Sequence, residues 1–215
     1  MSARETILGR VRAALGARSA DPHAVRAEAD ALLADAAAAR PALAGGDLVE
    51  SFVARVTAPR VAASAERIAT EAGLPAAVGA YLRARGLPAR IALQPDARLR
   101  ALDWAGFELR DEVAADEAVA VARARWGVAE TGSLVFHSGA DSPVLAHFLP
   151  LHHIVLLPAA DLLPWLEDYA AATAGEPPPR NVNLITGASG TTDIEGSLVL
   201  GAHGPRYLHV VIAGG

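Results

Sequence analysis

The residues with the clearest potential for chemistry lie in the last quarter of the chain, Thr186 to Pro205, which reads TGASGTTDIEGSLVLGAHGP. Glycines there allow positive φ angles, and hydroxyl side chains can cap a helix or bind a ligand oxygen. Apolar, strand-like runs flank the segment. A strand that leads through such a turn into a helix is typical of anion sites in α/β proteins, because the free amides at a helix start carry partial positive charge. We predict that this turn binds a small carboxylate or phosphate through Thr186, Gly187, Ser189, Thr191 and Asp193. An ordinary capped turn is the alternative.

Two further features of this segment concern proton transfer and charge. Asp193 and Glu195 fall in the first turn of a helix expected over residues 192–200, where carboxylates stabilise a helix or orient a ligand hydroxyl. His203 lies between glycines in the turn GAHGP, where it can donate to an anion or carry a proton. We therefore take His203 as a candidate catalytic residue, with a turn histidine bonded to a nearby carbonyl as the alternative.

A second dense turn, WGVAETGS at residues 126–133, places Glu130 between apolar runs. A buried carboxylate needs partners, so Glu130 accepts from backbone amides, pairs with Arg125 or Arg206, or faces a cleft. We favour the cleft, with Glu130 as a candidate catalytic residue and Thr131 and Gly132 as ligand-binding neighbours. A metal site at His152–His153 is disfavoured, because neighbouring strand residues point to opposite faces.

Composition excludes several kinds of chemistry. All nineteen basic residues are arginine, so no P-loop lysine or Schiff-base lysine is available. The chain has no cysteine and therefore no thiolate nucleophile or cysteine-ligated iron–sulfur cluster. A net charge of −5 argues against a nucleic-acid or anionic membrane surface. The N-terminus lacks the apolar run of a signal peptide, and we expect a cytoplasmic protein.

Apolar periodicity indicates an α/β fold. Two helices are expected before residue 40, forming an appendage over residues 1–45, and an α/β domain over 46–215. In that domain we expect a helix after Leu48 that contains Phe52, Val53 and Val56, and further helices at 65–72 (capped by Ser64), 75–85, 161–174 and 192–200. Strands are expected at 60–62, 89–93, 118–122, 132–137, 153–157, 182–186 and 207–212. Short apolar strands that alternate with helices predict a mostly parallel sheet with helices on both faces.

Four blocks together resemble the lactate utilization protein C family, whose domain is the LUD domain, formerly a domain of unknown function. The blocks are WGVAETGSLVF at 126–136, LPLHHIVLLP at 149–158, ITGASGTTDIEGSLVLGAHGP at 185–205 and YLHVVI at 207–212. The resemblance implies a three-layer α/β fold similar to the sugar-phosphate isomerase and CoA-transferase-like superfamily. It also implies a role in oxidising L-lactate to pyruvate with two iron–sulfur partner proteins, which would carry the clusters while this chain binds no cofactor.

The chain departs from the family in the turn itself. Ala188, Gly190 and Thr192 stand where the family has proline, arginine and alanine. The loss of the arginine removes a bidentate carboxylate donor, so Arg206 or Arg125 compensates, backbone amides suffice, or the ligand differs. By analogy with the superfamily, a stand-alone enzyme acting on a sugar phosphate or acyl-CoA is one alternative function. A non-catalytic scaffold subunit is another.

Overall fold

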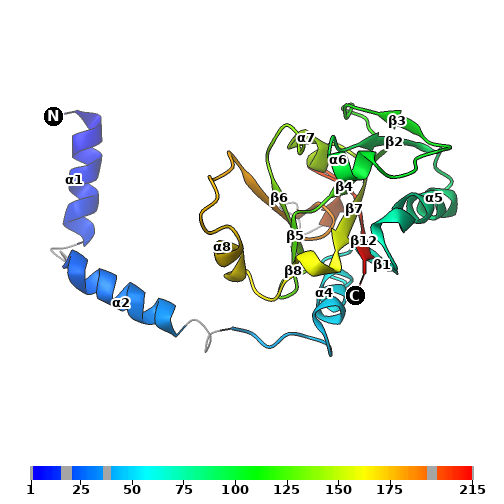
Figure 1. Cartoon of the computed structure of the whole chain (residues 1–215). Helices are drawn as coiled ribbons and strands as arrows, with labels where there is room; N and C mark the ends of the chain where they lie inside the picture. The colour runs from blue at the N-terminus through cyan, green and yellow to red at the C-terminus, as the bar shows by residue number, and fades with distance from the viewer. Residues whose placement is uncertain (1, 16–20, 36–39, 193–197, 215) are drawn as a thin grey trace. The chain divides into compact units, whose positions relative to one another are not determined.

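The computed structural model of the chain describes residues 2–15, 21–35, 40–192 and 198–214. The chain divides into two compact units, residues 1–41 and 42–215. The first contains α1 (Ala3–Leu15) and α2 (Pro22–Ala34), and no residue of either helix is buried (Figure 1). Asp21 caps α2 by accepting from the His23 amide at 3.0 Å. The apolar positions that predicted these helices are therefore exposed within this unit.

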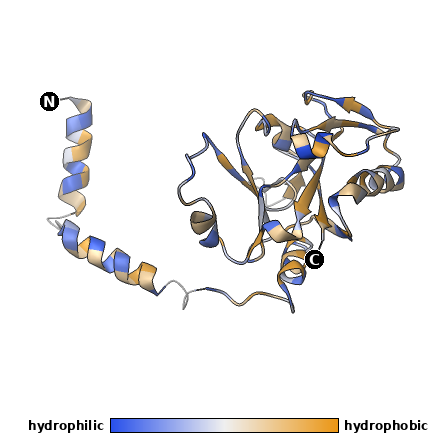
Figure 2. Cartoon of the chain, viewed as in Figure 1, coloured by the Kyte–Doolittle hydropathy of each residue, from blue (hydrophilic) through white to orange (hydrophobic). Residues whose placement is uncertain are grey.

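The second unit is built on a six-stranded sheet, in which every neighbouring pair is parallel, in the order β1-β12-β7-β4-β2-β3. Its strands are β1 (Ser64–Ile68), β2 (Arg90–Leu93), β3 (Glu108–Arg110), β4 (Val119–Arg123), β7 (His152–Pro158) and β12 (Tyr207–Ala213). All seven residues of β7 and six of seven in β12 are buried, as expected for strands covered on both faces. Figure 2 shows these central strands as largely hydrophobic.

Different elements cover the two faces of this sheet. On one face α5 (Leu74–Ala84) and α6 (Ala97–Arg100) pack through Leu74, Leu82 and Leu99 onto Val121 and Ile154. The other face is covered by α4 (Leu48–Val56) together with a second, four-stranded sheet in the order β8-β5-β6-β9. Its strands are β5 (Trp126–Val128), β6 (Ser133–His137), β8 (Leu162–Leu163) and β9 (Val182–Ile185).

This architecture confirms the predicted α/β fold with a mostly parallel sheet between two covering layers. The second sheet is new, because the runs at 132–137 and 182–186 form strands but lie outside the main sheet. The remaining elements are short: η1 (Glu71–Gly73), α7 (Leu145–Phe148), η2 (Ala159–Asp161) and α8 (Asp168–Ala172). Within the described residues, no helix is long and apolar enough to cross a membrane.

Three predictions of local structure before residue 190 are wrong. Ser64 starts strand β1 and does not cap a helix over 65–72. Strand β12 lies inside the sheet and is paired on both sides, and β1 is one of its two partners, in the register Ser64 to His209. Residues 60–62 form a turn instead of a strand. The helix expected over 161–174 is reduced to α8, because Leu162 and Leu163 pair with β5.

The helix expected over residues 192–200 is also wrong. Gly190–Thr192 is strand β10, which pairs antiparallel with β11 (Leu198–Leu200), in the register Gly190 to Leu200. β-Branched threonine and valine suit an extended backbone. Residues 193–197, which include Asp193 and Glu195, lie outside the described residues. The structure therefore removes the helix start on which the predicted anion site relied.

Candidate functional site

A cavity of about 210 Å³ brings together four of the residues predicted from sequence: Thr186, Gly187, Ser189 and His203. Its wall is made by α7, the end of β9, the turn 186–189 and the loop 203–205, with His147, Phe148, Leu184, Ile185, Ala188, Gly204 and Pro205 as the other lining residues. We call this cavity the hydroxyl cleft. Predicted residues from two separate turns thus share one site.

The turn 186–189 is held rigidly from both sides. Gly187 has φ +87°, and a Cβ there would collide with the carbonyl oxygen of Val61, so only glycine fits. The Ala188 amide donates to that same oxygen at 3.0 Å, and the Ser189 amide donates to the Pro205 carbonyl at 2.8 Å. These two amides are therefore already occupied, which favours recognition of a ligand by side-chain groups.

A chain of hydroxyl groups connects the second predicted turn to this cleft. The Thr131 and Ser133 Oγ atoms lie 2.7 Å apart, and Ser133 Oγ lies 2.5 Å from Thr186 Oγ1. Gly132, with φ +72°, allows the turn to pack against the backbone of Val56. Thr131 is thus connected to Thr186 of the cleft by hydrogen bonds through Ser133. Ser133 is buried, and the sequence did not mark it as a site residue although it ends the ETGS motif.

Glu130 is not among the residues that line the cleft. Its Oε2 accepts from the Leu166 amide at 3.1 Å, and its own amide donates to the Pro164 carbonyl at 3.0 Å. Arg125 instead donates to Glu176, and the Arg206 guanidinium lies over Tyr207. These two hydrogen bonds connect the Glu130 turn to the loop before α8. A catalytic role for Glu130 stays a prediction.

The remaining predicted residues lie at the edge of the described structure. Thr191 is exposed on β10, opposite Val199 of β11. Asp193 lies outside the described residues. His203 is exposed on its loop, so solvent or a ligand can reach it from the mouth of the cleft.

His147 is a residue of the cleft wall that the sequence analysis missed. It is fully buried, its Nε2 lies 3.0 Å from Ser142 Oγ, and its Nδ1 has no partner among the described residues. Burial lowers the pKa of His147 to about 4, so the ring is neutral at pH 7. His153 packs behind it, with ring centroids 5.5 Å apart, and burial also lowers its pKa well below the usual value. A buried histidine beside the cleft therefore has one nitrogen free for a hydrogen bond.

His152 and His153 lie on opposite faces of β7. His152 Nδ1 lies 3.0 Å from Tyr81 Oη on α5, whereas His153 packs against Phe136 of the second sheet. Within the described part of the chain, no three His, Cys, Asp or Glu residues form a group that could hold a metal ion.

The profile of the LUD domain matches residues 82–213, well over half of the chain. The chain belongs to the LUD domain family. The match contains both the Glu130 turn and the hydroxyl cleft, while α1, α2, α4 and β1 precede it. This LUD domain also has the fold of a solved structure, a duf162 family protein from Deinococcus radiodurans, with a TM-score of 0.54 and 20% identity over 78% of this chain and 96% of that one.

Several curated proteins are similar to part of this chain. "Lactate utilization protein C" of Halalkalibacterium halodurans is 33% identical over 44% of each chain, and that of Anoxybacillus flavithermus is 31% identical over 51% of each. "Uncharacterized protein YkgG" of Escherichia coli is 34% identical over 44% of this chain and 43% of its own. The chain thus spans about half the length of the curated relatives it matches.

Proposed function

We propose that this chain is a cytoplasmic component of a lactate-utilisation system that oxidises L-lactate to pyruvate. In this proposal it acts with two iron–sulfur proteins and binds a small anionic ligand in the hydroxyl cleft. Membership of the LUD family and the names of the relatives support the pathway. The observation that carries the ligand is that Thr186, Ser189 and His203, predicted from separate turns, line one cavity.

The size and lining of the hydroxyl cleft suit a three-carbon acid. Its volume of about 210 Å³ is below the roughly 300–1,000 Å³ of sites for drug-sized ligands. The Thr186 and Ser189 hydroxyls and the His203 ring can each donate to a carboxylate. Gly190 stands where the family has arginine, so in our proposal neutral donors replace a guanidinium.

The absence of cysteine supports the part of the proposal that places the iron–sulfur clusters on other chains. Iron–sulfur clusters are held by cysteine thiolates, and this sequence has none. In the proposal, electrons from the substrate therefore pass to clusters on the partner proteins, and this chain contributes the binding of the acid.

Lactate-dependent dye reduction tests the function. The two partner proteins are assayed with and without this chain, and with Ser189→Ala and Thr186→Val variants. We expect activity to need the chain and to drop about tenfold or more in each variant, as expected for loss of a hydrogen bond to a charged group. An assay in which adding the wild-type chain changes nothing contradicts the proposal.

The candidate base Glu130 is tested in the same assay. Glu130→Gln keeps the carbonyl oxygen that accepts from Leu166 but removes the proton acceptor. We expect a large loss of activity with unchanged thermal stability if Glu130 acts in catalysis. Full activity of the Glu130→Gln variant excludes Glu130 from the mechanism. Its role is then structural, through the hydrogen bond to the Leu166 amide.

The N-terminal unit supports the partner part of the proposal. Ile7, Leu15, Leu32 and Leu33 are 61–73% exposed in helices that bury none of their residues. Exposed apolar side chains on amphipathic helices are typical of surfaces that bind another protein. Deletion of residues 1–41 should abolish co-purification with the iron–sulfur proteins and leave the circular dichroism of the domain intact. Unchanged co-purification assigns the partner surface elsewhere.

A further inference from the structure

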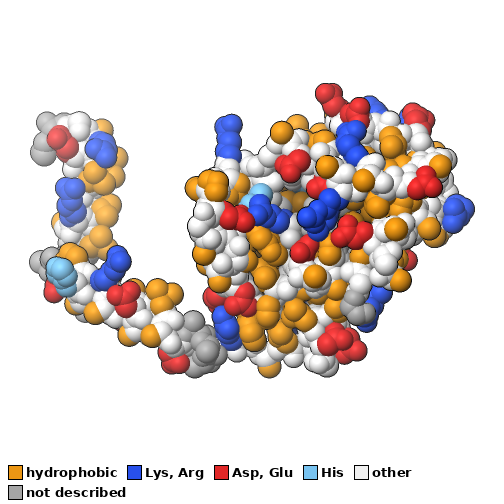
Figure 3. All heavy atoms as spheres, viewed as in Figure 1, with side chains coloured by type: hydrophobic (Ala, Val, Ile, Leu, Met, Phe, Trp, Pro, Cys, Tyr) orange, Lys and Arg blue, Asp and Glu red, His pale blue; other side chains and the backbone are white. Residues whose placement is uncertain are grey.

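A second and larger cavity, of about 490 Å³, lies at the carboxyl ends of the parallel strands. Gln94 directly follows β2, Arg123 ends β4, and Arg125, His137 and Ser138 complete one side of it. We call it the arginine cleft. Figure 3 shows arginine, acidic and histidine side chains gathered on the face of the domain seen in that view. None of these residues lines the hydroxyl cleft.

The place of this cavity in the topology is one at which parallel sheets bind ligands. From β2 the chain continues to β3 at the edge of the sheet, and then returns to β4 on the other side of β2. The direction of strand addition therefore reverses between β2 and β4. In open α/β sheets, ligands bind beyond the carboxyl ends of the strands at such a reversal.

The floor of the arginine cleft is rigid. Gln94 is 5% exposed, and its side-chain oxygen accepts from the Arg123 amide at 2.8 Å while its amide nitrogen donates to the Asp141 carbonyl at 2.9 Å. The Arg123 side chain is 11% exposed and donates to Asp161 at 2.8 Å. Arg123 Nε is buried and has no partner in the described part of the chain. Arg123 Nη2 also lies 4.0 Å from Glu71 Oε1. Arg123 is therefore a fixed residue of the lining.

Arg125 is oriented by its neighbours on one wall. Its Nη1 lies 3.2 Å from His137 Nδ1, and its guanidinium carbon lies 4.5 Å from the centre of the Trp126 ring. Because a guanidinium can only donate, His137 Nδ1 accepts, and its Nε2–H donates to Tyr169 Oη at 2.8 Å. Burial, followed by the charge of Arg125, lowers the pKa of His137, which agrees with a neutral ring.

The carboxylate of Glu176 occupies Arg125 in this structure. Arg125 Nη2 donates to both Glu176 oxygens, at 2.7 and 2.8 Å, and the two side chains are 42% and 39% exposed. Ion pairs this exposed add little stability, so an incoming anion displaces Glu176 at small cost. Pro177 and Pro179 of the same segment line the arginine cleft, and they also line a separate cavity of about 180 Å³ together with Tyr169 and Thr173.

We propose that the arginine cleft is a second ligand site, for an organic dianion, and that Glu176 is an internal competitor for Arg125. Arginine binds phosphate and carboxylate through paired hydrogen bonds. The Arg98 guanidinium has no ion pair within the described residues and adds a third positive charge to the lining. Asp96 and Asp141 also line the cavity, and the Asp96 carboxylate is engaged in capping α6. At about 490 Å³ the cavity is in the size range of sites for ligands larger than a three-carbon acid.

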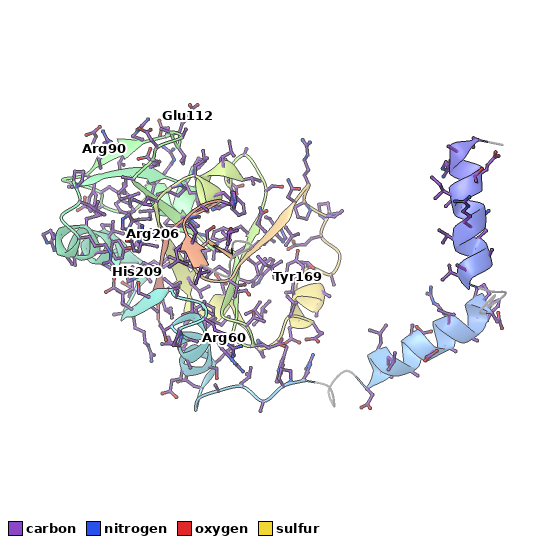
Figure 4. The ribbon with its side chains drawn as sticks, turned by 180° about the vertical axis from the view of Figure 1, so that it is seen from behind. Arg60, Arg90, Glu112, Tyr169, Arg206 and His209 are labelled. Atoms are coloured by element: carbon purple, nitrogen blue, oxygen red, sulfur yellow. The ribbon has the colours of Figure 1, made fainter. Side chains whose placement is uncertain are left out.

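Calorimetric titration of the full chain with AMP, a phosphate ester, and with succinate, a dicarboxylate, tests this proposal. We expect at least one to bind, Arg125→Gln to weaken that binding tenfold or more, and Glu176→Gln to tighten it by up to about fivefold. Arg90→Gln is the matched control, because Arg90 is exposed at the amino end of β2 and Figure 4 shows it well away from Tyr169.

The two probes and the two variants each test one part of the proposal. Preference for AMP identifies a phosphate ligand, and preference for succinate identifies a dicarboxylate. Failure of both to bind the wild-type chain overturns the site, as does unchanged affinity in Arg125→Gln when its circular dichroism matches wild type. Equal or weaker binding to Glu176→Gln overturns the competitor role.

Discussion

Acid should destabilise this protein between pH 6.5 and 4, with the buried histidine pair as a main cause. His147 is fully buried, and its pKa is about 4 in the folded chain against 6.5 for an exposed imidazole. Between these two values the unfolded chain binds a proton that the folded chain does not. The free energy of unfolding therefore carries no penalty from His147 above pH 6.5, falls steadily as the pH drops from 6.5 to 4, and loses nothing further from this residue well below pH 4.

The size of the effect follows from the two pKa values. Linkage gives a loss of about 2 kcal/mol in the free energy of unfolding between pH 7 and pH 5 for a histidine with this shift. Burial also lowers the pKa of His153, which therefore acts in the same direction. Against a total stability of roughly 5–15 kcal/mol, the loss is large enough to measure.

Urea denaturation at pH 7 and pH 5 checks this prediction. For His147→Gln we expect the difference between the two pH values to shrink by about 2 kcal/mol, whatever the variant's stability at pH 7. His23→Gln, at an exposed position on α2, is the control and should keep the wild-type difference. A His147→Gln variant with the full wild-type pH dependence refutes the reasoning.

Two further predictions concern the geometry of the sites. Gly187→Ala should destabilise the fold by about 3 kcal/mol, because this residue has a positive φ and a Cβ there clashes with Val61. Gly175→Ala is the control: Gly175 also has a positive φ (+83°) but open space around it, so the loss should be about 1 kcal/mol. Equal losses of stability in thermal denaturation contradict the clash. Gln94→Ala should cost about 2 kcal/mol by leaving the Arg123 amide unpaired, and a change below about 0.5 kcal/mol in urea denaturation would show that this bridge is dispensable.

The sequence predicts the core of the fold well where hydrophobicity alone decides the structure. The apolar run of β7 has all seven residues buried, and Pro75 lies in the first turn of α5 as expected. A continuous apolar run like that of β7 has no face suited to solvent. It therefore predicts a strand inside a sheet that is covered on both faces. Thr186 and His203, selected from separate turns, line the same cavity, and their role in binding a ligand stays a prediction.

The failures occur where pairing with distant residues overrides local preference. Ser64–Ile68 reads SAERI and contains helix-forming alanine, glutamate and arginine, yet it becomes β1 because it pairs with β12. The β10–β11 hairpin likewise depends on a pairing between Gly190 and Leu200. Arg123 was missed for a similar reason: its partner Asp161 is 38 residues away, and no short motif marks the contact.

The most direct test of the central claim is an NMR titration of the isotopically labelled full chain with L-lactate. If lactate binds in the hydroxyl cleft, the amide signals of Thr186, Ser189 and His203 should shift together and saturate, while that of Gln94 stays in place. Saturable shifts confined to Gln94 and its neighbours in the arginine cleft, or no shifts at millimolar lactate, would contradict the account.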